Sequence, residues 1–234
     1  MDSQYILDET ENYAVVFKQP KMHCTFANNI NQGHEEKSEN LYEWYAQKSP
    51  DCKIMHRLDY ETHGLVLFAK NEKSYLFFKD LQDNGEFVKE YSAVCCQYDS
   101  AEVPGFPPYS VREKSENIIE SYFRPFGPGR KLVRPVIDDT QNKHKDIAKD
   151  KGGFYRTEII NINDNKFTVQ IRRGFRHQIR CHLCWIGCPI LNDPLYPQPA
   201  DSASAGTLAL RAHALFFKDP ATGKQIEYRI DNIN

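Results

Sequence analysis

Short β-rich segments separated by turn residues are the feature of this sequence that most restricts its fold. The clearest segment is Gly64–Lys70 (GLVLFAK), whose mostly apolar run has the length of a buried strand. Further strands are predicted at Tyr13–Phe17, Glu86–Cys96, Phe154–Ile162, Lys166–Arg172, Thr207–Phe217 and Gln225–Ile230. Helices are fewer and do not alternate strictly with these strands. We therefore expect one α+β domain built around a mixed sheet.

Three segments have the periodicity or the end signals of helices. In residues 39–48 apolar side chains recur at helical spacing, and Asn71 can cap a second helix that ends near Asp83. A third helix is predicted from about Arg176 to Ile186. Loops or breaks are expected at residues 28–38, 103–109 and 138–153, where the sequence is polar, rich in proline or charged.

The composition excludes several classes of protein. Of the 234 residues, 40% are hydrophobic and 12% aromatic, which is enough to close a core and excludes wholesale disorder. No apolar run approaches the about 18 residues of a membrane span, and the acidic start lacks the features of a signal peptide. Seven cysteines are an odd number for a disulfide framework and are expected to be reduced thiols. We expect a soluble, cytoplasmic protein that is a monomer.

Charge is unevenly distributed along the chain, although the formal net charge is only −2. Residues 1–61 contain 6 basic and 11 acidic residues, a net charge of −5, and the remaining residues have a net charge of +3. Ser121–Ile137 and Gln170–His182 each contain several basic residues and no acidic one. A strongly basic nucleic-acid coat is thus excluded, and the two basic stretches predict one positive face.

Three short motifs contain residues suited to catalysis. His56-Arg57-Leu58-Asp59 places a carboxylate beside an arginine just before a buried strand, although alone it is more typical of a surface ion pair. Tyr91, in the motif Lys89-Glu90-Tyr91, is by itself more typical of a packed aromatic residue. Arg176 and Arg180 lie four residues apart on one helix face, so one could pair with a buried carboxylate while the other contacts phosphate.

The cysteines permit two other interpretations. Cys181-x-x-Cys184-x-x-x-Cys188, with histidines nearby, has some of the spacing of a zinc site. One helix displays these side chains over several faces, so small thiols buried against the sheet are the preferred prediction, and no metal is expected. A cysteine hydrolase could use Cys24 or Cys52, but nothing in the sequence provides an oxyanion hole nearby.

Taken together, the three motifs resemble those of the RluA-type family of RNA pseudouridine synthases. The family pattern HRLD-x-x-T-x-G-x-x-x-x-A-K is matched by residues 56–70, and its K-x-Y by residues 89–91. Its HQIR-x-HL and the later G-x-P-I-x-x-D-P-L-Y are matched by residues 177–196 (HQIRCHLCWIGCPILNDPLY). The resemblance covers nearly the whole chain and is weakest at residues 97–153. Three ordered motifs at family spacing are far more specific than any one of them.

The resemblance implies an architecture and an activity. The fold would be the pseudouridine synthase catalytic fold, an α+β structure with a bent, mixed and mostly antiparallel sheet flanked by helices and loops. It would form one domain over residues 1–234, without a separate N-terminal RNA-binding domain. The activity would be isomerisation of specific uridines to pseudouridine in structured RNA, either ribosomal or transfer RNA. The partner would be RNA and not a membrane, and no cofactor would be required.

The resemblance also implies roles for individual residues. Asp59 is the catalytic carboxylate, and Arg180 is its partner. Tyr91 would pack on the uracil and help to handle the C5 proton. The predicted substrate-binding residues are Arg57, Leu58, Arg176, His177 and Gln178.

Some alternatives stay open at this point. Asp59 could attack C1′, add to the uracil ring or remove the 2′ proton. Departures from the family pattern occur at Lys21, His63 and Phe175, and they leave Asp59 and its expected partners unchanged. A protein with this fold could also bind RNA without modifying it, although the intact catalytic residues argue against that hypothesis.

Overall fold

The computed structural model describes residues 5–25, 40–97, 103–109, 117–137, 153–197, 199 and 206–231. The loop predicted at residues 28–38 and most of the one at residues 138–153 lie outside this part of the chain. The described residues form two compact units. Unit 1 comprises Met1–Phe87 with Ala212–Ile230, and unit 2 comprises Val88–Arg211 with Asp231–Asn234. The single domain over residues 1–234 stays a prediction.

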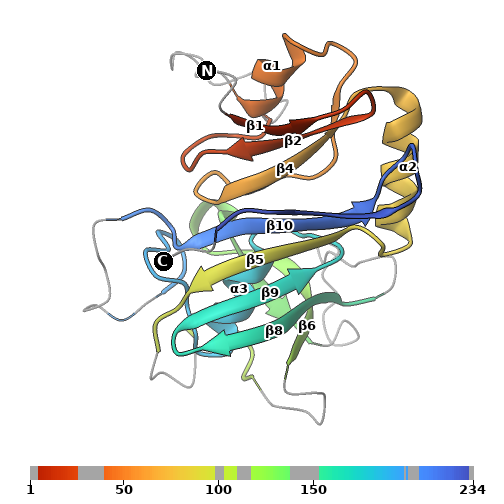
Figure 1. Ribbon diagram of the computed structural model, residues 1–234. Coiled ribbons are helices and arrows are strands. Elements are labelled where there is room, and N and C mark those ends of the chain that lie inside the picture. Colours follow the sequence, from red (N-terminus) through yellow and green to blue (C-terminus); the bar gives the residue numbers. More distant parts are fainter. Residues whose placement is uncertain are drawn as a thin grey trace, which may run out of the picture. The chain divides into compact units, whose positions relative to one another are not determined.

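Unit 1 contains a sheet of neighbouring strands β1 (Ile6–Glu9), β2 (Tyr13–Lys18), β4 (His63–Ala69) and β10 (Leu210–Lys218), in the order β1-β2-β4-β10 (Figure 1). Two outer strands complete it: β3 (Lys53–Ile54) pairs antiparallel with β4, and β11 (Gln225–Arg229) pairs antiparallel with β10. Its helices are α1 (Leu41–Ala46) and α2 (Glu72–Asp83). Within the described ranges, no helix is long and apolar enough to cross a membrane.

The core of unit 1 lies between this sheet and α2. Alternate residues of the strands point to the core, because successive side chains of a strand point to opposite faces. They include Tyr13 and Val15 of β2 and Leu65 and Leu67 of β4, all buried in one cluster with Phe78 of α2. The start of α2 is fixed by a capping box between Asn71 and Ser74, so the predicted cap and the predicted end of this helix are both confirmed.

Gly64 allows β4 to lie close to β10. Its φ angle is +122°, and a Cβ atom at this position would lie 2.2 Å from the carbonyl oxygen of Ala212. No other residue type fits this approach, since a side chain would collide with backbone and the φ angle is rare for L residues. The glycine of the first motif is therefore a packing requirement of the sheet.

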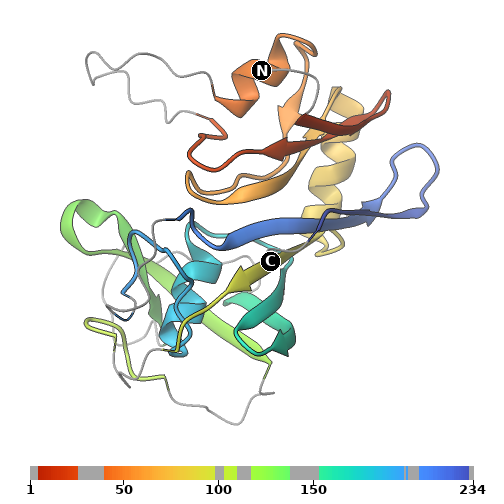
Figure 2. The same cartoon turned by 60° about the vertical axis from the view of Figure 1, so that its left-hand side comes forward.

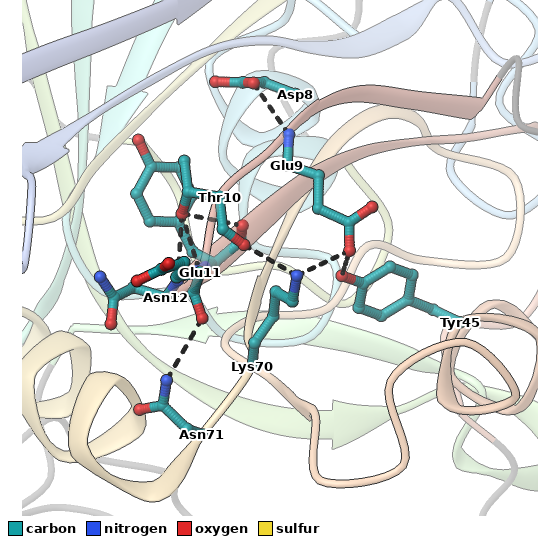
Figure 3. Close-up of polar contacts among 9 residues, drawn as sticks. Asp8, Glu9, Thr10, Glu11, Asn12, Tyr45, Lys70 and Asn71 are labelled. Atoms are coloured by element: carbon teal, nitrogen blue, oxygen red, sulfur yellow. Dashed lines mark hydrogen bonds and ion pairs between the residues drawn. The ribbon is translucent and has the colours of Figure 1, made fainter.

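A polar cluster joins the β1–β2 turn to α1 and to the end of β4 (Figure 3). Lys70 Nζ lies 2.9 Å from Glu9 Oε1 and donates to the carbonyl of Thr10 at 2.8 Å. The hydroxyl of Tyr45 donates to the same oxygen of Glu9 at 2.9 Å. The ammonium group of Lys70 lowers the pKa of the Glu9 carboxyl, although burial acts in the opposite direction. Lys70 closes the first motif and so has a structural role in unit 1.

Unit 2 contains a second group of antiparallel strands in the order β5-β9-β8-β6-β7. The strands are β5 (Val88–Val94), β6 (Ile118–Phe126), β7 (Leu132–Val136), β8 (Tyr155–Asn163) and β9 (Lys166–Ile171). A short 3₁₀ helix, η2 (Pro128–Arg130), connects β6 to β7. Helix α3 (Gln178–Trp185) packs against β7 and β8, as Figure 2 shows. Cys181 and Cys184 of α3 are buried with Phe123 and Val133 in the core of this unit.

The predicted strands and helices are present, with ends shifted by up to three residues. The residue patterns of the sequence predict neither the short strands β1 and β3 nor the longer strands β6 and β7. Pro125 and Pro135 lie within β6 and β7 and argue against strands in the sequence. The structure accommodates them because Pro125 lies near the end of β6 and Pro135 lies in β7, the last strand of the order. Nearly all of the basic stretch Ser121–Ile137 therefore belongs to the β6–β7 hairpin.

Candidate active site

Asp59 lies in the loop of residues 56–62, called here the Asp59 loop, between β3 and β4 of unit 1. Its side chain is partly exposed, that of Arg57 is exposed, and that of Leu58 is buried. The amide of Thr62 donates to the carbonyl of Asp59 at 3.1 Å, which closes a tight turn. The side chains of Asp59 and Arg57 are therefore accessible to solvent, whereas the buried side chain of Leu58 anchors the loop in the core.

The backbone on both sides of Asp59 is hydrogen-bonded by the last residue of β2, Lys18, and by Cys24, which follows this strand. The thiol of Cys24 accepts from the amide of Leu58 at 3.2 Å and donates to the carbonyl of the same residue at 3.5 Å. The ammonium of Lys18 donates to the carbonyl of Tyr60 at 3.3 Å, and also to the carbonyls of Gln19 and Met22. Asp59 thus lies between two residues whose backbone is fixed, and its own side chain takes no part in these bonds.

Burial changes the acidity of both groups that bind the Asp59 loop. It lowers the pKa of Lys18 to about 8, while the nearby charges of Asp59 and Glu61 favour the ammonium form. Burial raises the pKa of the Cys24 thiol, and that of Cys52 to about 11. Neither thiol is a ready thiolate at neutral pH, so the structure does not support the cysteine hydrolase hypothesis.

Tyr91 lies in β5 of unit 2 and is buried. Both of its neighbours in the motif bind the adjacent strand β9 or the residues that follow it. Lys89 Nζ donates to the carbonyl of Arg172 at 2.8 Å, and Gln170 Nε2 donates to Glu90 Oε2 at 2.6 Å. Complete burial lowers the pKa of Lys89 to about 8. These contacts fix the position of Tyr91 along the strand.

Arg180 lies on α3 of unit 2 and is the largest fully buried side chain of the described residues. Its Nε and Nη2 atoms donate to the two carboxylate oxygens of Asp193, at 2.8 and 2.6 Å. The two side chains are only 2% and 1% exposed. Sequence reasoning did not single out Asp193, although this residue is the aspartate of the matched D-P-L-Y pattern, which was the available signal.

Gln178 and His182 of α3 take part in a buried polar network with β6 and β8. Gln178 Nε2 donates to the carbonyl of Arg156 at 2.9 Å and to the hydroxyl of Thr157 at 3.2 Å. The imidazole of His182 bonds to the hydroxyls of Thr157 and Ser121, at 2.8 and 3.0 Å. Burial lowers the pKa of His182 to about 3, so the ring is neutral. This network fixes α3 on the sheet, and the substrate contact of Gln178 stays a prediction.

The two residues before Gln178 have different surroundings. Arg176 is exposed, and its Nη2 atom donates to the carbonyls of Arg130 and Leu132 at 3.0 and 3.1 Å. His177 precedes α3 in the left-handed conformation, with φ of +56°, and its ring contacts the edge of Tyr196. Strained backbone of this kind is enriched at functional sites.

The cysteines of α3 behave as the packing interpretation predicts. Cys181 and Cys184 are completely buried, and their thiols lie near the carbonyls of Val133 and Pro197. Burial raises the pKa of Cys184 to about 12. Among the described residues, no group of three or more histidine, cysteine or acidic side chains is arranged to bind a metal ion.

The predicted site residues are therefore divided between the two units. Asp59, Arg57 and Leu58 belong to unit 1, whereas Tyr91 and residues 176–180 belong to unit 2. Each group is well ordered by hydrogen bonds within its own unit. The contact between Asp59 and Arg180, and the substrate contacts of the other residues, stay predictions.

Comparisons with known proteins agree with the motifs. The ribosomal large subunit pseudouridine synthase C of Rickettsia typhi is 25% identical to the chain over 230 residues, which is 96% of this chain and 67% of that protein. The protein of the same name from Rickettsia felis is 26% identical over 226 residues, covering 96% of this chain and 66% of that protein. The chain thus spans about two thirds of the length of these relatives.

Two solved structures have the same fold. Human RNA pseudouridylate synthase domain containing 1 is similar with a TM-score of 0.64 and 16% identity, over 97% of this chain and 82% of that one. Human RNA pseudouridylate synthase domain containing 4 is similar with a TM-score of 0.62 and 14% identity, over 99% of this chain and 89% of that one. The predicted α+β pseudouridine synthase fold and the predicted class of enzyme, an RNA pseudouridine synthase, are confirmed. Since the sequence profile of the RNA pseudouridylate synthase family matches residues 12–185, the chain belongs to that family.

Proposed function

We propose that this protein isomerises specific uridines in structured RNA to pseudouridine, and that Asp59 is the catalytic carboxylate. The observation that best supports this role is the arrangement of the Asp59 loop. Hydrogen bonds from Cys24 and Lys18 fix the backbone on each side of Asp59, and the carboxylate itself stays partly exposed. A catalytic group needs this combination of a fixed position and access to substrate.

The proposed reaction breaks the N1–C1′ bond of uridine, turns the uracil and joins its C5 to C1′. C5 then loses its proton and N1 gains one, so the product is an isomer of the starting nucleotide. The atoms of the nucleotide are conserved, and neither oxidation nor phosphoryl transfer takes place. An ionised carboxylate can serve as the nucleophile or as the base. Attack on C1′, addition to the ring and removal of the 2′ proton all use Asp59 in its ionised form.

The other predicted residues act around this carboxylate. Arg180 is the partner of Asp59 and orients its carboxylate through hydrogen bonds from the guanidinium. Tyr91 packs on the uracil and handles the C5 proton, and Arg57 contacts the nucleotide beside its phosphate. Leu58, Arg176, His177 and Gln178 contribute to the substrate pocket. The uridine must leave its stack to reach such a site, so the enzyme flips the base out of the RNA.

The β6–β7 hairpin is the proposed surface for the RNA backbone. Arg124 and Arg134 lie directly opposite each other on these strands. Burial lowers the pKa of Arg134, and the neighbouring charge of Arg124 acts in the same direction. Binding of a phosphate group between such like charges relieves their repulsion. A positive face of modest size also permits release of the product, because phosphate contacts weaken steeply with salt.

The names of the relatives make large-subunit ribosomal RNA the first substrate to test. Transfer RNA, which the resemblance of the motifs leaves open, is the second. We propose that the protein acts on this RNA as a cytoplasmic monomer that needs neither metal nor organic cofactor.

The test is to incubate purified protein with transcribed large-subunit ribosomal RNA and, separately, with a pool of transfer RNA transcripts, and to quantify pseudouridine by mass spectrometry. Wild-type protein is expected to form pseudouridine at defined positions, and Asp59→Asn is expected to form none. Asp51→Asn is the matched control, since Asp51 is an exposed aspartate of the same unit. Wild-type activity in Asp59→Asn would overturn the role of Asp59. RNA binding without conversion by the wild type would identify a binding protein instead.

A further inference from the structure

The residues that follow α3 form a turn that holds a carboxylate independently of Arg180. Asp193 Oδ1 accepts from the amides of Leu195 and Tyr196, at 2.9 and 3.1 Å, and the amide of Asp193 donates to the carbonyl of Ile190 at 3.2 Å. A carboxylate that accepts two backbone hydrogen bonds has a fixed position. The orientation of Asp193 is therefore determined by the local chain before any contact with the arginine is considered.

Tyr196 restricts the guanidinium from a second direction. Its ring centre lies 5.5 Å from the Cζ atom of Arg180, within the range of a cation–π contact. Its hydroxyl donates to the carbonyl of Val133 at 3.1 Å and accepts from the amide of Val133 at 3.2 Å. The ring is thus fixed to β7, and it cannot move away from Arg180 without breaking both hydrogen bonds. Arg180, Asp193 and Tyr196 are called here the Arg180 cluster.

We infer that Asp193 is a positioning residue for uridine isomerisation: its carboxylate orients the Arg180 guanidinium, which in turn contacts the catalytic carboxylate. The inference rests on the proposed function, in which Arg180 is the partner of Asp59. Two N–H groups of Arg180 donate to Asp193. A guanidinium has five such donors in one rigid plane, so a bidentate contact with one carboxylate fixes the directions of all five.

The pairing has an electrostatic consequence for the catalytic carboxylate. Arg180 and Asp193 together have no net charge, so Arg180 stabilises a second carboxylate mainly through directed hydrogen bonds and less through an unbalanced positive charge. A carboxylate held in this way has a fixed orientation.

The test compares the steady-state kinetics of wild-type protein and Asp193→Asn on the RNA that the wild type modifies. Asparagine keeps the shape and one acceptor oxygen but removes the charge. The kcat is expected to fall about 10- to 100-fold, since misplacement of a catalytic partner has effects of this size. The KM for RNA is expected to change little, because phosphate contacts elsewhere determine binding. An unchanged kcat overturns the inference, and so does a loss confined to KM.

Asp219→Asn is the matched control. Asp219 is also buried, and its Oδ1 accepts from the amides of Ala221 and Thr222 in the same kind of turn, and from the hydroxyl of Thr222. Its kcat is expected to equal that of the wild type. To separate positioning from folding, Asp193→Asn is repeated in an Arg180→Lys background. If Asp193 acts through Arg180, the two effects on kcat are not additive, whereas additive effects contradict the inference.

Two further outcomes are distinguishable. If Asp193→Asn does not fold, Asp193→Glu replaces it, since glutamate keeps the charge and moves it by one methylene. A reduced kcat with an unchanged KM then supports the inference, and a wild-type kcat overturns it. If the wild-type protein forms no pseudouridine in any RNA, the proposed function fails. If the wild type is active and Asp59→Asn is inactive, a wild-type kcat in the Asp193 variants overturns only the positioning role of Asp193 and leaves the proposed function in place.

Discussion

The Asp59 loop and the Arg180 cluster hold their central residues in opposite ways. In the Asp59 loop, hydrogen bonds from Lys18 and Cys24 end on backbone atoms of the neighbouring residues, and the carboxylate is partly exposed. In the Arg180 cluster the side chain itself is bound on two nitrogen atoms and is almost completely buried. The first arrangement fixes a position and leaves the charged group accessible. The second fixes the charged group itself.

This difference predicts which variants lose stability and which lose only activity. A buried charge that loses its partner remains in a medium of low dielectric, where it is strongly disfavoured. A backbone contact that is lost beside an exposed loop allows that loop to move, and the rest of the unit stays folded. This distinction is tested by variants at Arg180, Lys18, His182 and Lys70.

Arg180→Ala is expected to destabilise the protein by about 3–5 kcal/mol, since it leaves Asp193 buried and without its cation. Urea denaturation followed by circular dichroism measures this change. Arg156→Ala is the control, because Arg156 pairs with Glu120 at 2.7 Å but its side chain is 59% exposed. Its loss is expected to be less than about 1 kcal/mol. Equal losses in the two variants would contradict the role assigned to burial.

Lys18→Met is expected to reduce kcat about 100-fold, the effect of misplacing a catalytic group by roughly 1 Å. Methionine fills the same buried space but cannot donate to the carbonyl of Tyr60, so the turn that contains Asp59 is released on one side. Lys79→Met on α2 is the control, since Lys79 is an exposed lysine of the same unit. Pseudouridine formation is measured alongside thermal unfolding. If Lys18→Met loses activity only in proportion to its loss of folded protein, the positioning role of Lys18 is excluded.

Parts of these two regions could be predicted from the sequence because their signals are local. The cap at Asn71 and the buried run Gly64–Lys70 depend on residues close in sequence, and both have the predicted structure. The partner of Arg180 could not be deduced in this way. Asp193 lies 13 residues away, beyond the end of the helix, and no helical spacing rule connects the two positions.

The contacts of the Asp59 loop and two strands of unit 2 could not be predicted from the sequence for a similar reason. The backbone contacts of Lys18 and Cys24 with the Asp59 loop span 34 to 42 residues and exist only once the sheet has formed. The strands β6 and β7 were hidden by Pro125 and Pro135, which are tolerated because of where they lie in the sheet. Sequence motifs therefore identified the reacting groups, whereas the contacts that orient them required the tertiary structure.

His182 makes unit 2 sensitive to acid. Its folded pKa of about 3 lies below the ordinary histidine pKa of 6.5, so between these values the unfolded chain binds a proton that the folded chain does not. The free energy of unfolding is therefore expected to decrease as the pH falls from 6.5 toward 3, by at most about 1.4 kcal/mol per pH unit. His182→Gln keeps polar contacts and cannot titrate, so its dependence on pH is expected to be shallower. Urea denaturation at several pH values measures the slopes. His23→Gln, at an exposed position, is expected to keep the wild-type slope.

Lys70→Met tests the exposed counterpart of the Arg180 cluster. Lys70 and Glu9 have several partners, as Figure 3 shows, but their side chains are 23% and 36% exposed. Water and salt screen this pair, so the loss of stability is expected to be about 0.2–1 kcal/mol at pH 7. The pKa of Glu9 is lowered in the folded protein, so its stabilising effect is present above pH 4.5 and is lost as the pH falls through the folded value. The difference between wild type and Lys70→Met is therefore expected to shrink at pH 3 and in 1 M salt. A difference at pH 7 as large as that of Arg180→Ala would show that the number of contacts, and not burial, determines how strongly each region depends on its charges.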